Sequence, residues 1–228
     1  NLPALTDFGV RDILVGYLTG NKSIYDFYTV LASDYIYPDV TQLVTFVDNH
    51  DVGRAMFFAD SDIEKFKIAF HLLLTTRGIP QIFYGTEIGM KENEDHGTLR
   101  KNFPGGFPED VRNAFTKEGR TEYENDIYDY FKNMLSLRKL YPALAKGELI
   151  HFPPHNEVYV YFKKYEDEII LNIVNAGDNY SKIDLAKYRH LMGSGTKLIN
   201  ISNSETVDIT DKIKITVPNK KAVMFLVK

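Results

Sequence analysis

The chain has 228 residues and a formal net charge of −4, and its composition excludes several classes of protein. The acidic balance leaves no basic surface to neutralise phosphates, so we expect no nucleic-acid partner. The absence of cysteine rules out disulfides and thiolate metal sites. No apolar run reaches the roughly 18–20 residues of a membrane span. Residues 1–5 show no basic region followed by an apolar stretch, so we expect no signal peptide.

The first 142 residues alternate between short apolar runs and helical patterns. The runs predict strands, the first of them buried, at 4–8, 43–47 and 79–84. The helical patterns cover 10–18, 24–31, 63–74 and 127–141, and capping boxes are expected at Ser23–Asp26 and Ser61–Glu64. Residues 85–125 read as one long loop, and loops of this length are usually functional. A repeated strand–helix order predicts a parallel sheet covered by helices.

From about residue 148 the apolar pattern changes to a period of two. Short strands are predicted at 158–162, 168–174, 212–217 and 222–227, with turn signals between them. This pattern is typical of an antiparallel β-sandwich and places a domain boundary near residue 143.

Three polar residues lie just past the second predicted strand: Asn49, His50 and Asp51. Such side chains can bind the hydroxyls of a sugar. In a (β/α)₈ barrel, residues just past the carboxyl ends of the strands form the active site. Taken alone, the same triplet is equally typical of a turn that ends in a capping aspartate.

Two motifs at these strand ends resemble a known family. Phe46–Asp51 (FVDNHD) and Gly78–Gly85 (GIPQIFYG) resemble strands seven and eight of the α-amylase family of glycoside hydrolases. The resemblance implies an α/β plus all-β fold. Residues 1–142 would form the last three βα units of a (β/α)₈ TIM barrel, strands six to eight, and residues 143–228 a C-terminal antiparallel β-sandwich.

The resemblance also implies roles for the residues around the first motif. Asp51 corresponds to the third acidic residue of the active site, which holds the 2- and 3-hydroxyls of the glucose whose bond is broken. Hydrogen bonds of this kind strengthen in the transition state of glycoside hydrolysis. His50 would contact the same hydroxyls, and Asn49 would order the strand end. Arg54, a further substrate-site candidate, is expected to brace the loop rather than to touch sugar.

A second set of candidates lies in the long loop. Asp95–Phe107 is similar to the D-G-x-x-R-x-D-F-P-G-G-W loop of the neopullulanase and cyclomaltodextrinase branch. By that resemblance, Arg100 and Phe103 would line the donor-side subsites. Asn102 and Phe107 depart from the pattern, and a role in loop packing is the alternative.

Four other residues receive expectations. Glu87 is expected to be a structural acceptor beneath the site, and Tyr84 and His71 are expected in the core. Asp7, with its neighbour Phe8, resembles the end of strand six and could approach the acceptor side.

The family's nucleophile and general acid are expected on strands four and five, yet neither pattern occurs in this sequence. The D-x-x-x-N-H pattern that accompanies calcium is also absent, so we expect no cofactor in this chain, although the intact parent could bind calcium. We therefore predict a chain that is inactive alone. Its unpaired strand edges predict that it pairs with its missing barrel half or with another copy.

The leading hypothesis is part of a retaining α-glucan hydrolase of α-amylase, neopullulanase or cyclomaltodextrinase type, acting on α-glucan or maltooligosaccharide. It would cleave α-1,4 bonds, with α-1,6 cleavage and transglycosylation as variants. One alternative is a non-catalytic, α-amylase-like binding or assembly protein. Another makes the β-sandwich a starch-binding module, although no exposed aromatic pair stands out in its sequence. The compartment stays open, with a lean toward a periplasmic parent.

Overall fold

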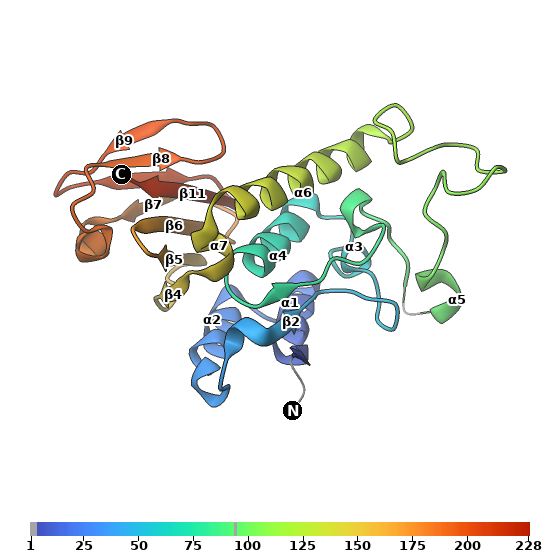
Figure 1. The fold of residues 1–228 in the computed structure, drawn as a ribbon, viewed down its shortest axis with the longest axis horizontal. Coiled ribbons are helices and arrows are strands. Elements are labelled where there is room, and N and C mark those ends of the chain that lie inside the picture. Colours follow the sequence, from blue (N-terminus) through green and yellow to red (C-terminus); the bar gives the residue numbers. More distant parts are fainter. Residues whose placement is uncertain (1–3, 94) are drawn as a thin grey trace.

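The computed structural model describes residues 4–93 and 95–228. The helices lie beside an antiparallel β-sheet, and the long loop that follows α5 projects away from that sheet (Figure 1). Within the described ranges no helix is both long and apolar enough to cross a membrane. Residues 1–3, on which the signal-peptide expectation partly rests, lie outside the described residues.

A parallel three-stranded sheet forms the amino-terminal part. It contains β1 (Leu5–Thr6), β2 (Leu43–Thr45) and β3 (Ile79–Pro80) in the order β1-β2-β3. Leu5 pairs with Leu43, and Val44 pairs with Ile79, both in parallel. The parallel arrangement confirms the expectation from the strand–helix order.

Two details of this sheet differ from expectation. The first strand is not buried, because β1 pairs with β2 on one side only, and Leu5 is 52% exposed. The third strand ends at Pro80 instead of extending to Tyr84. Gly78 enters it with a φ of 79°, and a Cβ at this position would lie 2.5 Å from the Leu43 carbonyl oxygen. The close approach to β2 therefore requires glycine.

The four predicted helices are present in the expected order as α1, α2, α4 and α6, and three short helices, α3, α5 and α7, were not predicted. The α-helices are α1 (Phe8–Thr19), α2 (Ile24–Ala32), α3 (Ala55–Phe58), α4 (Ile63–Thr75), α5 (His96–Leu99), α6 (Glu122–Leu140) and α7 (Pro142–Lys146). Short 3₁₀ turns are η1 (Asp34–Ile36), η2 (Val40–Gln42), η3 (Thr86–Ile88) and η4 (Ala186–Met192). The segment 85–125 is not one continuous loop, because η3, α5 and the start of α6 lie within it.

The helix caps confirm one prediction and correct another. Ser23 and Asp26 form the expected capping box at α2. The predicted box at Ser61 is wrong, because Ser61 adopts a φ of 66° and Asp62 caps α4 instead, accepting from the Lys65 amide at 3.0 Å. An unpredicted box begins at Thr121, so α6 starts before the expected residue 127.

The carboxyl-terminal part is antiparallel throughout, as expected. One sheet has the order β4-β5-β6-β11-β8-β9, and β7 pairs with β10 in a second, smaller sheet. The bounds are β4 (Glu148–His151), β5 (Val158–Tyr165), β6 (Glu168–Asn175), β7 (Ser181–Asp184), β8 (Lys197–Asn200), β9 (Thr206–Asp208), β10 (Lys214–Val217) and β11 (Lys221–Val227).

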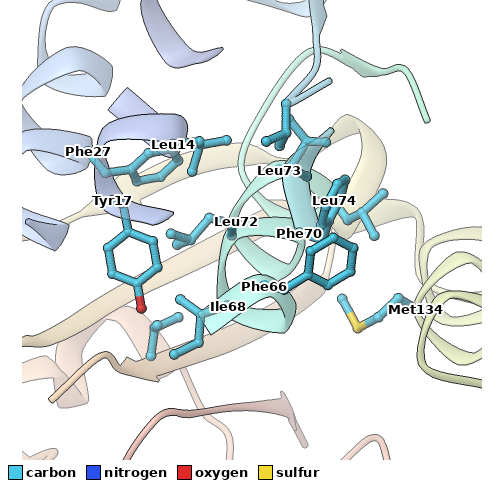
Figure 2. Close-up of a cluster of buried hydrophobic side chains, with 14 of the residues drawn as sticks. Leu14, Tyr17, Phe27, Phe66, Ile68, Phe70, Leu72, Leu73, Leu74 and Met134 are labelled. Carbon is cyan, nitrogen blue, oxygen red and sulfur yellow. The ribbon is translucent and has the colours of Figure 1, made fainter. Parts of the chain in front are cut away.

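The two faces of the larger sheet bury side chains in different cores. Alternate residues of β5, such as Tyr159 and Tyr161, join the cluster that includes α1, α2, α4 and α6. Figure 2 shows part of this cluster, with Phe66, Phe70 and Leu73 of α4 at its centre. The intervening β5 residues face β7 and β10 in a second cluster. The expected division at residue 143 stays a prediction, because the first cluster is continuous across it.

The buried Lys163 and the partly buried Arg138 join the end of α4 to the rest of the molecule. Arg138 of α6 donates to the carbonyl oxygens of Leu74 at 2.5 Å and Gly78 at 3.1 Å. Lys163 of β5 donates to the Thr76 carbonyl oxygen. The bonds to Leu74 and Thr76 satisfy carbonyl groups that a helix leaves free at its carboxyl end. Burial, with the nearby Arg138 charge, lowers the pKa of Lys163 to about 7.

Candidate active site

The segment after β2 turns sharply at Asn49. The Asn49 side-chain oxygen accepts from the Asp51 amide at 2.8 Å, and Asn49 also forms an isolated bridge with Val52. The amide-to-side-chain bond closes a local turn of the kind that asparagine favours. Asn49 thus orders the strand end, and the Asp51 carboxylate remains available for other partners.

The structure brings three of the predicted site residues together. Arg100 Nη2 donates to Asp51 Oδ1 at 3.0 Å, and Arg100 Nε donates to the His50 carbonyl oxygen at 3.1 Å. His50 Nε2 lies 3.1 Å from Asp51 Oδ2. All three side chains are more than half exposed. The group therefore offers an acceptor and two donors to solvent on one surface, which is the chemistry that vicinal sugar hydroxyls require.

Arg54 lies beneath this group and is fully buried. Its guanidinium donates to the carbonyl oxygens of Tyr84 at 2.5 Å and Leu99 at 3.0 Å. It also lies over the Phe83 ring, 4.1 Å from the centroid. This position fits the expected bracing role. A side chain that is not exposed to solvent cannot contact a bound sugar directly. Because Leu99 directly precedes Arg100, this bond anchors the loop that carries Arg100, the residue that pairs with Asp51.

Asp48 is the buried residue that the sequence reasoning missed. Its carboxylate accepts from the Ala55 amide at 2.9 Å and from the Thr86 hydroxyl at 2.9 Å. Burial raises the pKa of this carboxyl, and the two hydrogen bonds oppose that shift. Asp48 lies inside the FVDNHD motif, so the signal was present, but a charged residue at a strand end does not reveal which way it points.

The remaining loop candidate, Phe103, is half-buried. Its ring stacks on Phe115, with centroids 4.5 Å apart. The nearby turn is closed by Asp110, whose carboxylate accepts from the amides of Gly105 at 2.7 Å and Phe107 at 3.0 Å. These contacts support the loop-packing alternative for Phe103, and its place in a donor subsite stays a prediction.

The Asp7 carboxylate is engaged within the fold, and its approach to the acceptor side of the site stays a prediction. It caps α1 through the Val10 amide at 2.9 Å and pairs with Arg77 at 2.6 Å. Arg77 also contacts Asp34 at 2.5 Å, so a mostly buried ion triad joins the start of α1, η1 and the segment that follows α4. No local sequence pattern predicts this triad, because its members are far apart in the chain.

Three further expectations have different outcomes. His71 is buried as predicted, and burial lowers its pKa to about 4. Tyr84 is not in the core, because its ring is 40% exposed and its hydroxyl donates to the Lys101 carbonyl oxygen at 3.0 Å. Glu87 is partly buried, and burial raises its pKa.

No group of three or more acidic or histidine side chains within 4–93 and 95–228 is arranged to hold a metal ion. The cofactor expectation stays a prediction for the whole protein.

Comparison with known proteins agrees with this geometry. Residues 19–120 match the α-amylase catalytic domain, and residues 149–225 match the cyclomaltodextrinase C-terminal domain. The chain is 34% identical to a cyclomaltodextrin glucanotransferase from Geobacillus stearothermophilus over 64% of its length and 18% of that protein. It is 27% identical to a cyclomaltodextrinase from Geobacillus thermopakistaniensis over 69% of its length and 24% of that protein.

Solved structures show the same fold. An Anoxybacillus α-amylase superposes with a TM-score of 0.80 at 23% identity, covering 98% of this chain and 47% of that one. A Geobacillus thermoleovorans α-amylase, solved with acarbose, superposes with a TM-score of 0.76 at 24% identity, covering 97% and 46%. The fold is thus that of an α-amylase-type barrel domain followed by a C-terminal β-sheet domain.

Residues 19–120 and 149–225 thus resemble, in chain order, the catalytic domain of α-amylases and the C-terminal domain of cyclomaltodextrinases. The chain spans about a fifth of the length of the curated relatives described above. The activity of any longer protein that contains it is therefore a matter for proposal.

Proposed function

We propose that this chain supplies the substrate-distorting aspartate of a retaining α-glucan hydrolase of α-amylase, neopullulanase or cyclomaltodextrinase type. The observation that carries the proposal is the contact group formed by Asp51, His50 and Arg100 at the carboxyl end of β2. In this reading, β1, β2 and β3 are strands six to eight of the barrel.

The Asp51 carboxylate would accept hydrogen bonds from two neighbouring sugar hydroxyls. Such charge-assisted bonds strengthen as positive charge develops on the ring, which lowers the barrier to bond cleavage. Arg100 holds the carboxylate through one oxygen, so it orients Asp51 and also limits its freedom before sugar binds. His50 donates from the other side when its Nε2 carries the proton.

Cleavage with retention needs two more carboxyl groups, about 5–5.5 Å apart, one as nucleophile and one as general acid. The family patterns that hold them do not occur in residues 1–228. We propose that they come from other barrel strands, supplied by a longer polypeptide or a partner chain, and that this chain alone is inactive. The half-exposed Leu5 and Ile79, on the two edge strands β1 and β3, support such pairing, because exposed apolar side chains at a sheet edge favour association.

The experiment is product analysis on the longest natural polypeptide that contains this chain. With γ-cyclodextrin, pullulan and maltoheptaose, we expect maltose or panose whose new reducing end is initially the α-anomer, seen by proton NMR. Glucan products longer than the substrate would indicate transglycosylation. Glucan binding without any turnover would favour the non-catalytic alternative and contradict the proposal.

A further inference from the structure

The β-rich part contains a hollow far from Asp51. It measures about 710 Å³ and lies between residues 153–156, the start of β5, β7 and the first turn of η4. This is within the range of volumes typical of small-molecule sites. Figure 1 shows β7 at the opposite end of the molecule from α3 and α5. The hollow is therefore separate from the site that contains Asp51.

The hollow combines an apolar base with a polar rim. Its buried lining residues are Val158, Val160, Ile183 and Tyr188, all of the second core cluster. Apart from Pro153, its exposed lining residues carry polar groups: His155, Asn156, Tyr180, Lys182, Asp184 and Lys187. Sugars have apolar C–H faces and polar edges, so a surface of this kind can satisfy both.

Both sides of the rim are held in place by local structure. Asn156 and Glu157 adopt φ values of 50° and 59°, and mutual backbone bonds of 3.0 Å between His155 and Val158 close the turn. On the other side, the buried Asn175 side chain donates to the carbonyl oxygens of Asn179 at 2.8 Å and Val217 at 3.1 Å. A rim already fixed before binding loses little conformational entropy when a ligand arrives.

Tyr180 is the most informative residue of the rim. It directly follows Asn179, whose carbonyl oxygen is held by the Asn175 side chain, and 71% of its surface is exposed. A large aromatic ring exposed beside a hollow offers a flat apolar face together with a polar hydroxyl. Lys182, Lys187 and Asp184 give the rim a formal net charge of +1, and their charged groups can donate to and accept from sugar hydroxyls.

We propose that this hollow binds α-1,4-glucan chains, with Tyr180 as the stacking platform. The choice of an α-glucan rests on the proposed function, while the site itself rests on the rim, the base and the exposed ring. Binding here would hold a polymer on the molecule at a distance from the cleavage site, and two linked contacts raise the effective concentration of substrate.

The test uses the full chain in an Asp51→Asn background, which weakens sugar binding at the first site. The chain contains no tryptophan, so Tyr180→Trp introduces a single fluorescent reporter at the rim. Maltoheptaose should change its emission, and cellohexaose should not. Tyr35→Trp is the matched control, because Tyr35 is 86% exposed and does not line this hollow. Its emission should stay constant with both sugars.

The affinity itself is measured by titration calorimetry with maltoheptaose. In the same background, Tyr180→Ala should weaken binding about tenfold, and Tyr35→Ala should leave it unchanged. The proposal would be overturned if maltoheptaose and cellohexaose changed the tryptophan emission equally. It would also be overturned if about 10 mM maltoheptaose caused no change in emission and no heat of binding. The hydrolysis assay on the natural polypeptide reads the Asp51 site independently. Hydrolysis by the natural polypeptide, together with no maltoheptaose binding at the hollow, would refute this inference and leave the proposed function standing.

Discussion

Arg54 and Arg100 show how burial changes the contribution of an arginine at the same site. Arg54 is fully buried and donates to two carbonyl groups, whereas Arg100 is half-exposed and pairs with Asp51. Removing a buried donor leaves its acceptors unsatisfied, while an exposed ion pair contributes little to stability.

We therefore expect Arg54→Met to lower the free energy of unfolding by about 2–4 kcal/mol. Arg100→Met should change it by less than about 1 kcal/mol, because its partner remains in water. Urea denaturation of the two variants measures both values. Equal losses would show that Arg54 does not brace the loop as its contacts indicate.

His71 makes stability depend on pH. Burial holds its pKa at about 4 in the folded state, below the ordinary value of 6.5. Between these values the unfolded chain binds a proton that the folded chain does not, so this residue lowers stability as the pH falls from 6.5 toward 4. His71→Gln should flatten the pH profile of urea midpoints in that window. His96→Gln, at an exposed position, is the control and should leave the profile unchanged.

At the scale of elements, the sequence predicted the order of strands and helices well but not their ends. Apolar periodicity identified α1, α2 and α4, because burial against a sheet imposes that spacing. The caps were less certain, since Ser61 and Asp62 are both typical capping residues and only the backbone angles distinguish them. Contacts between distant residues, such as Arg77 with Asp7 and Asp34, leave no local signal at all.

The corrected cap of α4 gives a direct prediction. Asp62→Ala should lower stability by about 1–2 kcal/mol, because the Lys65 amide loses its acceptor. Ser61→Ala should have little effect, within about 0.5 kcal/mol. Thermal or urea denaturation decides between them, and a larger loss for Ser61 would restore the originally predicted box.

The buried cation at the end of α4 gives a second pH effect. The folded-state pKa of Lys163 is lowered to about 7, whereas the unfolded chain keeps its proton up to the ordinary value of 10.5. The unfolded state therefore binds more protons in this window, so stability due to this group rises from pH 7 toward 10.5. Lys163→Met should remove that rise, with the exposed Lys164→Met as control. An unchanged slope in Lys163→Met would contradict the assignment.

At the scale of the whole molecule, the helices and the larger β-sheet share one hydrophobic cluster. The Tyr161 hydroxyl of β5 and the Thr75 hydroxyl of α4 form a hydrogen bond of 2.5 Å, which links the larger β-sheet to the helices. We expect a single cooperative unfolding transition, so that hydrogen exchange of α4 and β6 amides responds to urea with the same midpoint. Two separated midpoints would show that the parts fold independently.

The central claim is that Asp51 stabilises the transition state of α-glucan cleavage. The most direct measurement is kcat/KM for γ-cyclodextrin on the longest natural polypeptide, comparing Asp51→Asn with Asp12→Asn. Asp12 is an exposed carboxylate on α1 and serves as the matched control. The account predicts a loss of about 10²–10³-fold or more for Asp51→Asn and near-normal values for Asp12→Asn. Full activity of Asp51→Asn would contradict it.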